Sequence, residues 1–490
     1  MVILILRVQN IFSMDTRRVF LFISLLFCSP LITQAQNKKP DLSPVTQPDT
    51  GKNNLIIPLN PHSNGNDTSL TLQQCIDYAM LHQPALNKAL INVSITKATN
   101  SINLSGWLPQ ASASGNLIHY IQQSSTSSNT TLPGGSVTPG GTGVTQRGQY
   151  SNTFIPGVSV SQALFNPSLL YAAKSAPLFL KQAQQVTDST KIFLVSAVSK
   201  SFYNVLLTLE QINVLKEDTA RLGKNLRDAY HQYKGGIVDE TDYEQAAITL
   251  NNSTAQLKQA NENVVPQYAA LKQLMGFQSE KEFNVSFDTV QMIKGIYIDT
   301  TQQLQYEKRI EFQQVKTNKD IQSKLVGFYR TSYLPTLSAF YNYNLGYDNN
   351  KFSNLLSNSY PSSLVGVSFN IPIFTGFSRV HNLQKAKLEE QLIAWDEADL
   401  KLQINKEYTT ALANYKGNFY NLQLLQKNVA MAKRVYFVVN LQYKQGIVPY
   451  LNVITAESNL ITSEISYLNA LFQVLSSKVD LQKAMGSISY

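Results

Sequence analysis

An internal repeat constrains the fold of this 490-residue chain more than any other feature of its sequence. The segment Gln232–Val238 (QYKGGIV) matches Gln442–Val448 (QYKQGIV) in six of seven places, at an offset of 210 positions. Three further pairs recur in the same order: Met275-Gly276 with Met485-Gly486, Gly157-Val-Ser with Gly366-Val-Ser, and Trp107-Leu-Pro with Tyr333-Leu-Pro. Ordered matches of this kind indicate a tandem duplication, so the fold must be built from two similar halves.

Each half contains two segments that alternate between apolar and polar residues. We predict strands at about 109–120, 154–165, 335–346 and 363–373. Ala111 and Ala113 interleave with serines, and Val365 and Val367 interleave with Gly366 and Ser368. About ten residues is the length that a tilted strand needs to cross a bilayer.

An ordinary half-buried soluble sheet would produce the same alternation. Aromatic residues at the predicted strand ends favour a membrane, because such residues gather at the two interfaces of outer-membrane barrels. These residues are Trp107, Tyr120, Phe154, Phe165, Tyr333, Tyr341, Tyr343 and Phe374. The connecting segments, about 121–152 and 347–363, are rich in Ser, Asn and Gly, as expected of exposed outer loops.

The predicted helices are unusually long. From Phe377 to Lys444 there is no proline and Gly417 is the only glycine, so we predict one helix over 377–445. At 1.5 Å per residue this helix would be about 100 Å long, and the run Pro167–Lys234 is comparable. Apolar residues recur at spacings of three and four in both runs, which predicts side-by-side coiled-coil packing. A shorter helix is predicted to begin at Ser69, with Thr71 and Gln74 at the spacing of a capping box.

The N-terminus has the pattern of a secretory signal peptide over residues 1–35. Arg17 and Arg18 precede an apolar run from Val19 to Ile32, and Thr33-Gln34-Ala35 follows as the expected cleavage site. A retained membrane anchor is the alternative, but the run is short for a span and contains Pro30. A lipid anchor at Cys28 is disfavoured because Phe27 stands where a small residue is needed. Residues 36–68 are predicted to be a flexible leader.

Composition excludes several classes of function. The formal net charge is +9, but the basic residues are scattered, so we predict no nucleic-acid binding. The five histidines lack metal-ligand spacing and no nucleophile motif is present, so we predict neither enzymatic activity nor a cofactor or metal. After signal cleavage Cys75 alone remains, which excludes an intrachain disulfide.

Four strands cannot close a membrane barrel by themselves. An open sheet would leave two edges with unpaired backbone groups in hydrocarbon, at a cost of several kcal/mol for each group. Two copies would supply eight strands and three would supply twelve, and the pattern alone does not choose between them. Oligomerisation is therefore predicted if these strands cross a membrane.

The order of these features resembles the TolC family of efflux and secretion channels. The resemblance extends from about Leu70 to Gly486 and includes the start Leu70–Ala79, the Trp-Leu-Pro and Tyr-Leu-Pro motifs, and the duplicated Tyr-x-x-Gly segments. It implies a mainly α-helical channel-tunnel with a β-barrel portion. Each protomer would supply four membrane strands, and its long coiled-coil helices would form part of a periplasmic α-barrel.

The resemblance also implies a function, partners and a location. The chain would be a passive outer-membrane exit duct, a homotrimer in outer-membrane lipid, working with a periplasmic adaptor and an inner-membrane pump of the RND or ABC type. The alternative is a soluble, secreted coiled-coil interaction protein. The implied domains are residues 69–276 for the first repeat, 277–310 for an equatorial linker and 311–490 for the second repeat.

The helix-turn-helix tips are the candidate site for gating and adaptor contact. Tyr443 matches the position of the family's gate tyrosine, whereas Val448, Asn452 and Thr455 replace its gate arginine and constriction aspartates. The acidic cluster that contains Asp239 and Asp242 either complements a helix N-terminus or forms a cation-attracting rim. The candidate site residues are Tyr233, Gly236, Asp239, Asp242, Tyr443, Gly446, Asn452 and Thr455.

Overall fold

The computed structural model describes residues 69–121, 150–286 and 295–490. The predicted signal peptide, the leader and most of the first polar loop lie outside the described residues. The helices are α4 (Leu72–His82), α5 (Pro84–Ser105), α6 (Pro167–Lys234), α7 (Glu240–Met275), α9 (Ile310–Thr331), α10 (Ser378–Lys444) and α11 (Tyr450–Met485). The strands are β1 (Ser69–Leu70), β2 (Gln110–His119), β3 (Asn152–Phe165), β4 (Asn284–Val285), β5 (Thr336–Asn349) and β6 (Ser359–Asn370), with 3-10 turns η1 (Tyr306–Lys308) and η2 (Phe352–Asn354).

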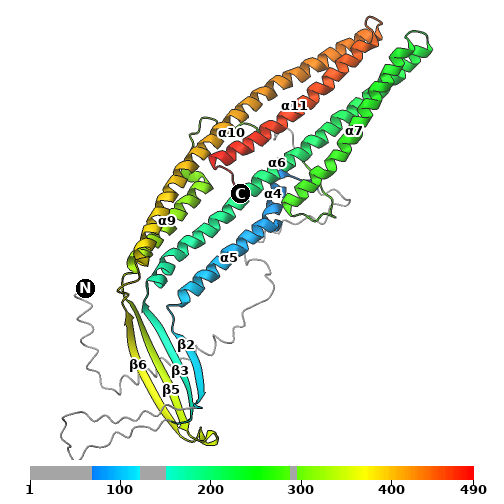
Figure 1. Ribbon diagram of the computed structural model, residues 1–490. Helices are drawn as coiled ribbons and strands as arrows, with labels where there is room; N and C mark the ends of the chain where they lie inside the picture. Colours follow the sequence, from blue (N-terminus) through cyan, green and yellow to red (C-terminus); the bar gives the residue numbers. More distant parts are fainter. Residues whose placement is uncertain (1–68, 122–149, 287–294) are drawn as a thin grey trace, which may run out of the picture. The chain divides into compact units, whose positions relative to one another are not determined.

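Four of the strands form one antiparallel sheet in the order β2-β3-β5-β6 (Figure 1). Its register separates an apolar face from a polar face, because side chains alternate along each strand. The apolar face includes the cross-strand row Ala111, Val160, Tyr341 and Val365. The adjacent row on the other face is Ser112, Ser159, Asn342 and Leu364, so this face is mostly polar, and the two serine hydroxyls are 2.7 Å apart.

Two features of the sheet differ from the sequence prediction. β6 begins at Ser359 and ends at Asn370, so Ile371 and Ile373 fall outside the strand that we predicted over 363–373. Pro372 has no N–H to donate to a neighbouring strand, which accounts for the earlier end. Tyr341 and Tyr343 lie in the middle of β5 rather than at an end, because this strand extends to Asn349.

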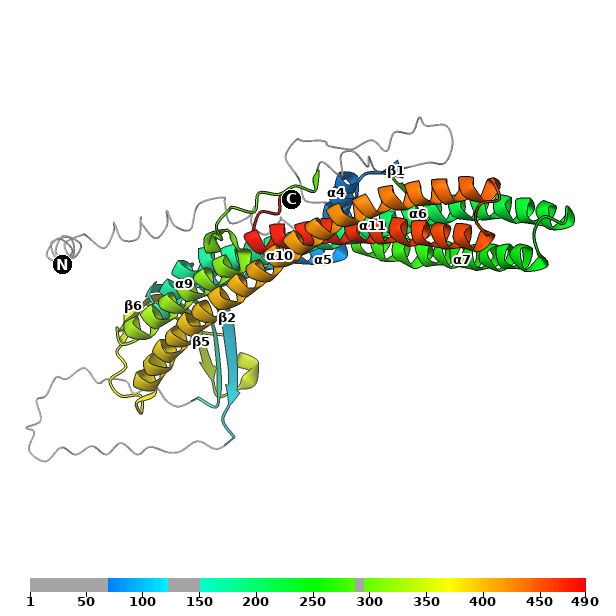
Figure 2. The ribbon, with the colours of Figure 1, turned by 90° about the horizontal axis from the view of Figure 1, so that it is seen from above.

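The helices next to the sheet form a row that follows the order of the strands. α5 contacts α6, α6 contacts α9 and α9 contacts α10, just as β2, β3, β5 and β6 neighbour one another. Beyond this row, α6 pairs with α7 and α10 pairs with α11, and α11 also packs against α6 (Figures 1 and 2). Each repeat thus ends in one long helical hairpin.

The first apolar core lies where α4, α6 and α7 meet. Phe202 and Val205 of α6 pack there with Leu271 and Met275 of α7 and with Cys75 of α4. Burial raises the pKa of the Cys75 thiol to about 12, so the side chain remains an uncharged packing group. One stretch of α6 is apolar enough to resemble a membrane helix, but half of that stretch is buried within the chain.

The second core lies between α10 and α11 and includes Tyr415, Val474 and Leu481. The buried Arg309 guanidinium ties the start of α9 to this region. It donates to Glu407 of α10 at 2.7 Å and to the carbonyl of Ala484 in α11 at 3.0 Å. These charge-assisted bonds fix the end of the second repeat against its own long helix.

The start of the first repeat confirms one local prediction and corrects another. Thr71 caps α4 in a capping box with Gln74, as the sequence predicts. Ser69 and Leu70 do not belong to the helix, however. They form β1, which pairs in parallel with β4 at Asn284–Val285, because their backbone extends away from the cap.

Gly157 of β3 provides a test of the sheet register. A Cβ at this position would lie 2.0 Å from Asn344 Oδ1 and 3.0 Å from the Tyr343 carbonyl oxygen of β5. The Asn344 side chain can rotate away but the Tyr343 backbone cannot, so Gly157→Ala should destabilise the folded protein by about 1 kcal/mol. The thermal midpoint followed by circular dichroism measures this effect. Gly346→Ala is the matched control, because its nearest contact would be 3.5 Å. Equal midpoints for the two variants would contradict the register.

Candidate functional site

The sheet and the row of helices are both open at their edges. Among the residues that the structure describes, β2 and β6 each have one strand neighbour, and they are joined to the outermost helices, α5 and α10. Both outermost helices carry exposed apolar residues at heptad spacing. On α5 these are Ile91, Ile95 and Ile102, and on α10 they are Leu388, Leu392, Trp395 and Leu402.

The two hairpin tips have the same backbone geometry. Gly236 and Gly446 adopt φ values of +70° and +75°, the left-handed region in which glycine is favoured. In each tip the glycine N–H donates to the tyrosine carbonyl three residues earlier, at Tyr233 or Tyr443. The repeated Tyr-x-x-Gly motif therefore encodes two equivalent turns, as the sequence predicts.

The structure brings the second tip against the first. The Tyr443 hydroxyl donates to Gln232 Oε1 at 2.6 Å, so it joins α10 to α6. Burial raises the pKa of Tyr443, and the nearby carboxylates of Asp242 and Asp228 raise it further. A cavity of about 260 Å³ lies beside this contact and is lined in part by Asn225, Asp228 and Tyr450.

The other candidate residues do not all join this contact. Tyr233 stacks on Tyr243 within its own hairpin, with ring centroids 6.1 Å apart. Asp239 is the N-cap residue of α7 and Asp242 lies in its first turn, which is the position that a helix dipole favours for negative charge. Asn452 and Thr455 are exposed in the chain, and the Thr455 hydroxyl donates to the carbonyl of Leu451 in its own helix.

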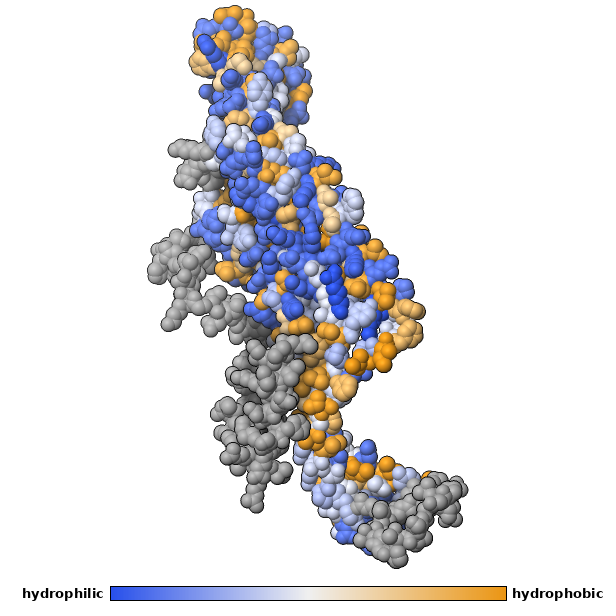
Figure 3. All heavy atoms as spheres, turned by 90° about the vertical axis from the view of Figure 1, so that its left-hand side faces the viewer, coloured by the Kyte–Doolittle hydropathy of each residue, from blue (hydrophilic) through white to orange (hydrophobic). Residues whose placement is uncertain are grey.

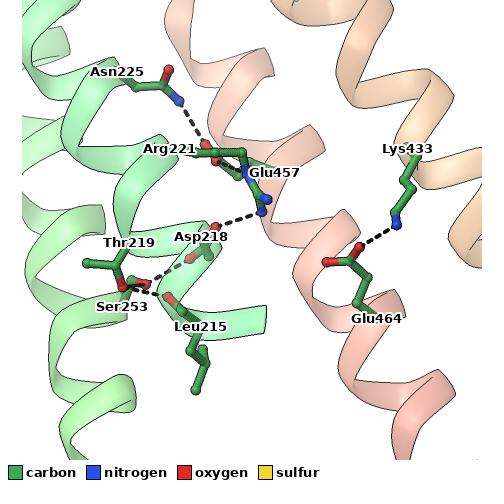
Figure 4. A network of polar contacts seen from close by, with 9 residues as sticks. All are labelled: Leu215, Asp218, Thr219, Arg221, Asn225, Ser253, Lys433, Glu457 and Glu464. Atoms are coloured by element: carbon green, nitrogen blue, oxygen red, sulfur yellow. Dashed lines mark hydrogen bonds and ion pairs between the residues drawn. The ribbon is translucent and has the colours of Figure 1, made fainter. Parts of the chain in front are cut away.

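A buried group of charges lies further from the tips and joins the two hairpins (Figure 4). Arg221 of α6 contacts Asp218 Oδ1 at 3.3 Å and Glu457 Oε1 of α11 at 3.5 Å. Asn225 donates to the second Glu457 oxygen at 3.0 Å, and Ser253 of α7 donates to the second Asp218 oxygen at 2.8 Å. Both carboxylates are 1% exposed. We call Asp218, Arg221, Asn225, Ser253 and Glu457 the interhairpin cluster.

One guanidinium serves two carboxylates in this cluster, so one negative charge is left without a cationic partner inside it. Burial raises the pKa of Glu457 to about 7, the charge of Asp218 adds to this effect, and Arg221 and Asn225 oppose it. Burial also raises the pKa of Asp218. Tyr436 of α10 lies against the cluster, with its ring centroid 6.0 Å from the Arg221 Cζ atom.

Our sequence reasoning missed the interhairpin cluster, although a signal was present. Asp218 lies between Leu215 and Leu222, and Glu457 lies between Val453 and Leu460, so each interrupts an apolar seam. A carboxylate at a seam position is buried when the helix packs, and it then needs a partner. The identity of that partner depends on contacts between helices more than 200 positions apart in the sequence.

The arrangement defines a class of protein. A sheet with one apolar and one polar face, open at both edges and continued by a row of very long helices, is the wall segment of an oligomeric membrane channel. Comparison with known proteins agrees. The family model "Outer membrane efflux protein" matches residues 75–277 and 303–487. The chain belongs to this outer membrane efflux protein family.

Curated relatives have corresponding names. The "Outer membrane protein TolC" of Vibrio cholerae is 19% identical over 348 residues, which cover 70% of this chain and 79% of the relative. The "Probable efflux pump outer membrane protein TtgC" of Pseudomonas putida is 23% identical over 427 residues, 85% of this chain and 82% of the relative. The resemblance to the TolC family is confirmed.

Solved structures share the fold. The CmeC outer membrane channel of Campylobacter jejuni superposes with a TM-score of 0.66 at 22% identity, over 85% of each chain. The outer membrane protein VceC of Vibrio cholerae gives 0.66 at 14% identity, over 85% of this chain and 96% of VceC. The predicted channel-tunnel fold is confirmed. The protein is an outer-membrane exit duct with a large periplasmic part, and the alternative of a soluble interaction protein is not favoured.

Gly446 tests the role of the second tip. A Cβ at this position would have no atom within 4 Å, so only the backbone conformation opposes a side chain. Gly446→Val should strain the turn by about 1–2 kcal/mol and impair export while leaving oligomer assembly intact. Gly446→Asn is the control, because asparagine tolerates the left-handed region. Cellular accumulation of a compound that the wild-type protein is first shown to export measures this effect, and unchanged export by the valine variant would refute the role of this turn.

The raised pKa of Glu457 predicts how the stability of the folded protein depends on pH. Its pKa is higher in the folded protein than the ordinary 4.5, so the folded state binds a proton that the unfolded state has released. The free energy of unfolding should therefore fall as pH rises from about 4.5 to about 7. Glu457→Gln should flatten this dependence and leave the protein at least as stable at pH 8, as thermal midpoints across the range would show.

Glu464→Gln is the control for this measurement. Glu464 lies on the same helix and pairs with Lys433 at 3.0 Å. It makes no contact with Glu457, and its charge acts on the cluster only by raising the pKa of Asp218. Its substitution should leave in place the pH dependence that Glu457 causes. A Glu457→Gln protein with the wild-type pH dependence would contradict the assignment.

Proposed function

We propose that three copies of this chain assemble into a closed channel that carries substrates from an inner-membrane pump to the cell exterior. The two open edges of the sheet are the observation that carries the proposal. β6 of one copy would pair with β2 of the next, and three copies would give a twelve-stranded barrel. The apolar face with Val160 and Val365 would meet lipid, and the polar face with Ser159 and Asn342 would line the pore.

The helices support the same closure. The exposed seams on α5 and α10 lie on the helices joined to the two edge strands, so pairing β6 with β2 would bring these seams together. Each seam repeats at heptad spacing, which suits coiled-coil packing between copies. One assembly would thus pair the open edges of the sheet and cover the exposed seams of the helices. The repeats at 69–276 and 311–490 would each supply two strands of this wall, with 277–310 as the equatorial linker.

The tips would form the periplasmic entrance and the contact for an adaptor protein. The proposal rests on the equivalent turns at Gly236 and Gly446 and on the Tyr443–Gln232 hydrogen bond between the hairpins of one chain. Opening the entrance would separate these hairpins. Asp239 and Asp242 would place negative charge at the rim, and Asn452 and Thr455 would present uncharged groups where they face the pore.

The pump partner would be of the RND or ABC type. Relatives named as efflux pump outer membrane proteins support an efflux role. The channel itself would perform no chemistry, because a wide aqueous lumen requires only passage and control of its entrance.

Mass and conductance test the assembly. Purified in mild detergent, the protein should have the mass of three chains plus bound detergent, and it should form conducting pores in planar bilayers. A monomer without conductance would contradict the proposal. Release from cells without detergent would instead support a soluble protein.

Leu392 tests the helical seam separately. It is 61% exposed on α10, so Leu392→Lys should cost a single chain little but should oppose packing between copies. We expect the trimer fraction to fall several-fold in light-scattering measurements. Gln391→Lys is the matched control, because Gln391 is the neighbouring exposed residue and is already polar. Equal trimer fractions for the two variants would exclude this seam from the interface.

A further inference from the structure

The cavity beside the Tyr443–Gln232 hydrogen bond is formed by helices of both hairpins. Its walls include Asp228, His231 and Gln232 of α6, Asn440 and Tyr443 of α10, and Tyr450 of α11. We call this space of about 260 Å³ the interhairpin cavity. A single water needs only about 10–15 Å³ of such space, so the cavity has room for a small organic molecule. A molecule bound there would contact both hairpins at once.

Two polar side chains of the interhairpin cavity have no partner in the part of the chain that the structure describes. Tyr450 is 1% exposed, and its hydroxyl is buried without a hydrogen bond. The carboxylate of Asp228 makes neither an ion pair nor a hydrogen bond with a described residue. Because an unpaired buried hydroxyl costs free energy, groups of this kind in folded proteins nearly always bind a partner.

The charges that act on the two tyrosine hydroxyls of the cavity are negative. Burial raises the pKa of Tyr443, and the carboxylates of Asp242 and Asp228 raise it further. Burial also raises the pKa of Tyr450, and Glu457 and Asp242 add to this effect. The interhairpin cluster contributes to the same potential, since its one guanidinium serves two carboxylates. The interhairpin cavity therefore favours a cationic ligand.

The walls of the cavity also suit an apolar body attached to the cation. The rings of Tyr443 and Tyr450 pack together with centroids 5.3 Å apart, and Val453 lines the same space. A cation beside an aromatic face is attracted by the ring electrons. Figure 3 shows apolar residues among hydrophilic ones at the tip end of the molecule, at the top of that view.

A metal ion fits the cavity less well than an organic cation. In the residues that the structure describes, no three histidine, cysteine, aspartate or glutamate side chains come together as metal ligands. The acceptors at the cavity are instead one carboxylate together with amide and hydroxyl oxygens from separate helices. Acceptors of this kind match the three N–H groups of a primary ammonium ion.

The chain has a cation of its own at the cavity. Lys444 of α10 lines the space, but its side chain is exposed and forms no ion pair with Asp228 in the described structure. Its long side chain is flexible and its ammonium group is strongly hydrated. Lys444 is therefore a competitor for Asp228 that a ligand must displace.

We propose that the interhairpin cavity binds a small primary organic ammonium ion, which pairs with Asp228 and donates a hydrogen bond to the Tyr450 hydroxyl oxygen. The ligand contacts α6 on one side and α10 and α11 on the other, so it binds best when the two hairpins lie together. It thereby holds the periplasmic entrance closed. Only this effect on the entrance rests on the proposed function, because binding needs no more than the folded chain.

Thermal midpoints of the assembled protein in mild detergent test the binding. The probes are benzylammonium, which carries the charge, and benzyl alcohol, which has nearly the same shape without it. We expect benzylammonium to raise the midpoint progressively with concentration at constant ionic strength, and benzyl alcohol not to do so. Equal effects of the two probes, or no effect of benzylammonium, would overturn the proposal.

Four variants locate the site. Asp228→Asn should weaken benzylammonium binding at least tenfold and Tyr450→Phe several-fold. Without the probe, Tyr450→Phe should be no less stable than the wild type, because the hydroxyl has no partner to lose. Glu244→Gln is the matched control, since it removes the charge of an exposed carboxylate in α7 that does not line the cavity. Lys444→Gln should bind the probe more tightly.

Two results from the variants would contradict the site. Wild-type affinity in Asp228→Asn would show that the probe binds elsewhere. Weaker binding to Lys444→Gln than to the wild type would show that the cavity recognises an anion.

Conductance in planar bilayers separates binding from its effect on the entrance. Benzylammonium added on the side of the tips should lower the open probability of the wild type and should have much less effect on Tyr450→Phe. Binding as expected with unchanged conductance would overturn the closing effect while the site stands. Absence of any conducting pore, with binding intact, would instead contradict the proposed function.

Discussion

The backbone hydrogen bonds that β2 and β6 do not make within the described part of one chain are the constraint on which the rest of the structure depends. Backbone N–H and C=O groups in hydrocarbon have no water to bind, so each unpaired group costs several kcal/mol. A four-stranded sheet with an apolar face can therefore enter a bilayer only when its edges find partners. The exposed seams on α5 and α10 extend the same requirement along the helices, since those helices continue from the edge strands.

The interhairpin cluster places buried charges where apolar side chains could have packed. Packing α6 against α11 with apolar residues alone would give a stable contact, yet Asp218 and Glu457 are buried there and share Arg221. Buried ion pairs contribute little net stability, but breaking one by removing a partner is costly. The cluster therefore makes the relative position of the two hairpins specific, at a contact that the proposed opening of the entrance would loosen.

Local features were predictable from the sequence, whereas long-range pairings were not. The left-handed turns at Gly236 and Gly446 and the cap at Thr71 depend on residues within a few positions of one another, so the local pattern sufficed. The end of β6 and the central position of Tyr341 in β5 depend on register between strands, which alternation alone does not specify. Predicting the interhairpin cluster would have required knowledge of how α6 packs against α11. Among the candidate tip residues, only Tyr443 makes a side-chain hydrogen bond between the hairpins.

Hydrogen exchange at the sheet edges tests the central claim most directly. In protein reconstituted in lipid vesicles, the amides of β2 and β6 should exchange as slowly as those of the central strands β3 and β5, because every edge group is paired with another copy. Fast exchange along the outer sides of β2 and β6, with slow exchange at β3 and β5, would show that the edges are unpaired and would contradict a closed barrel.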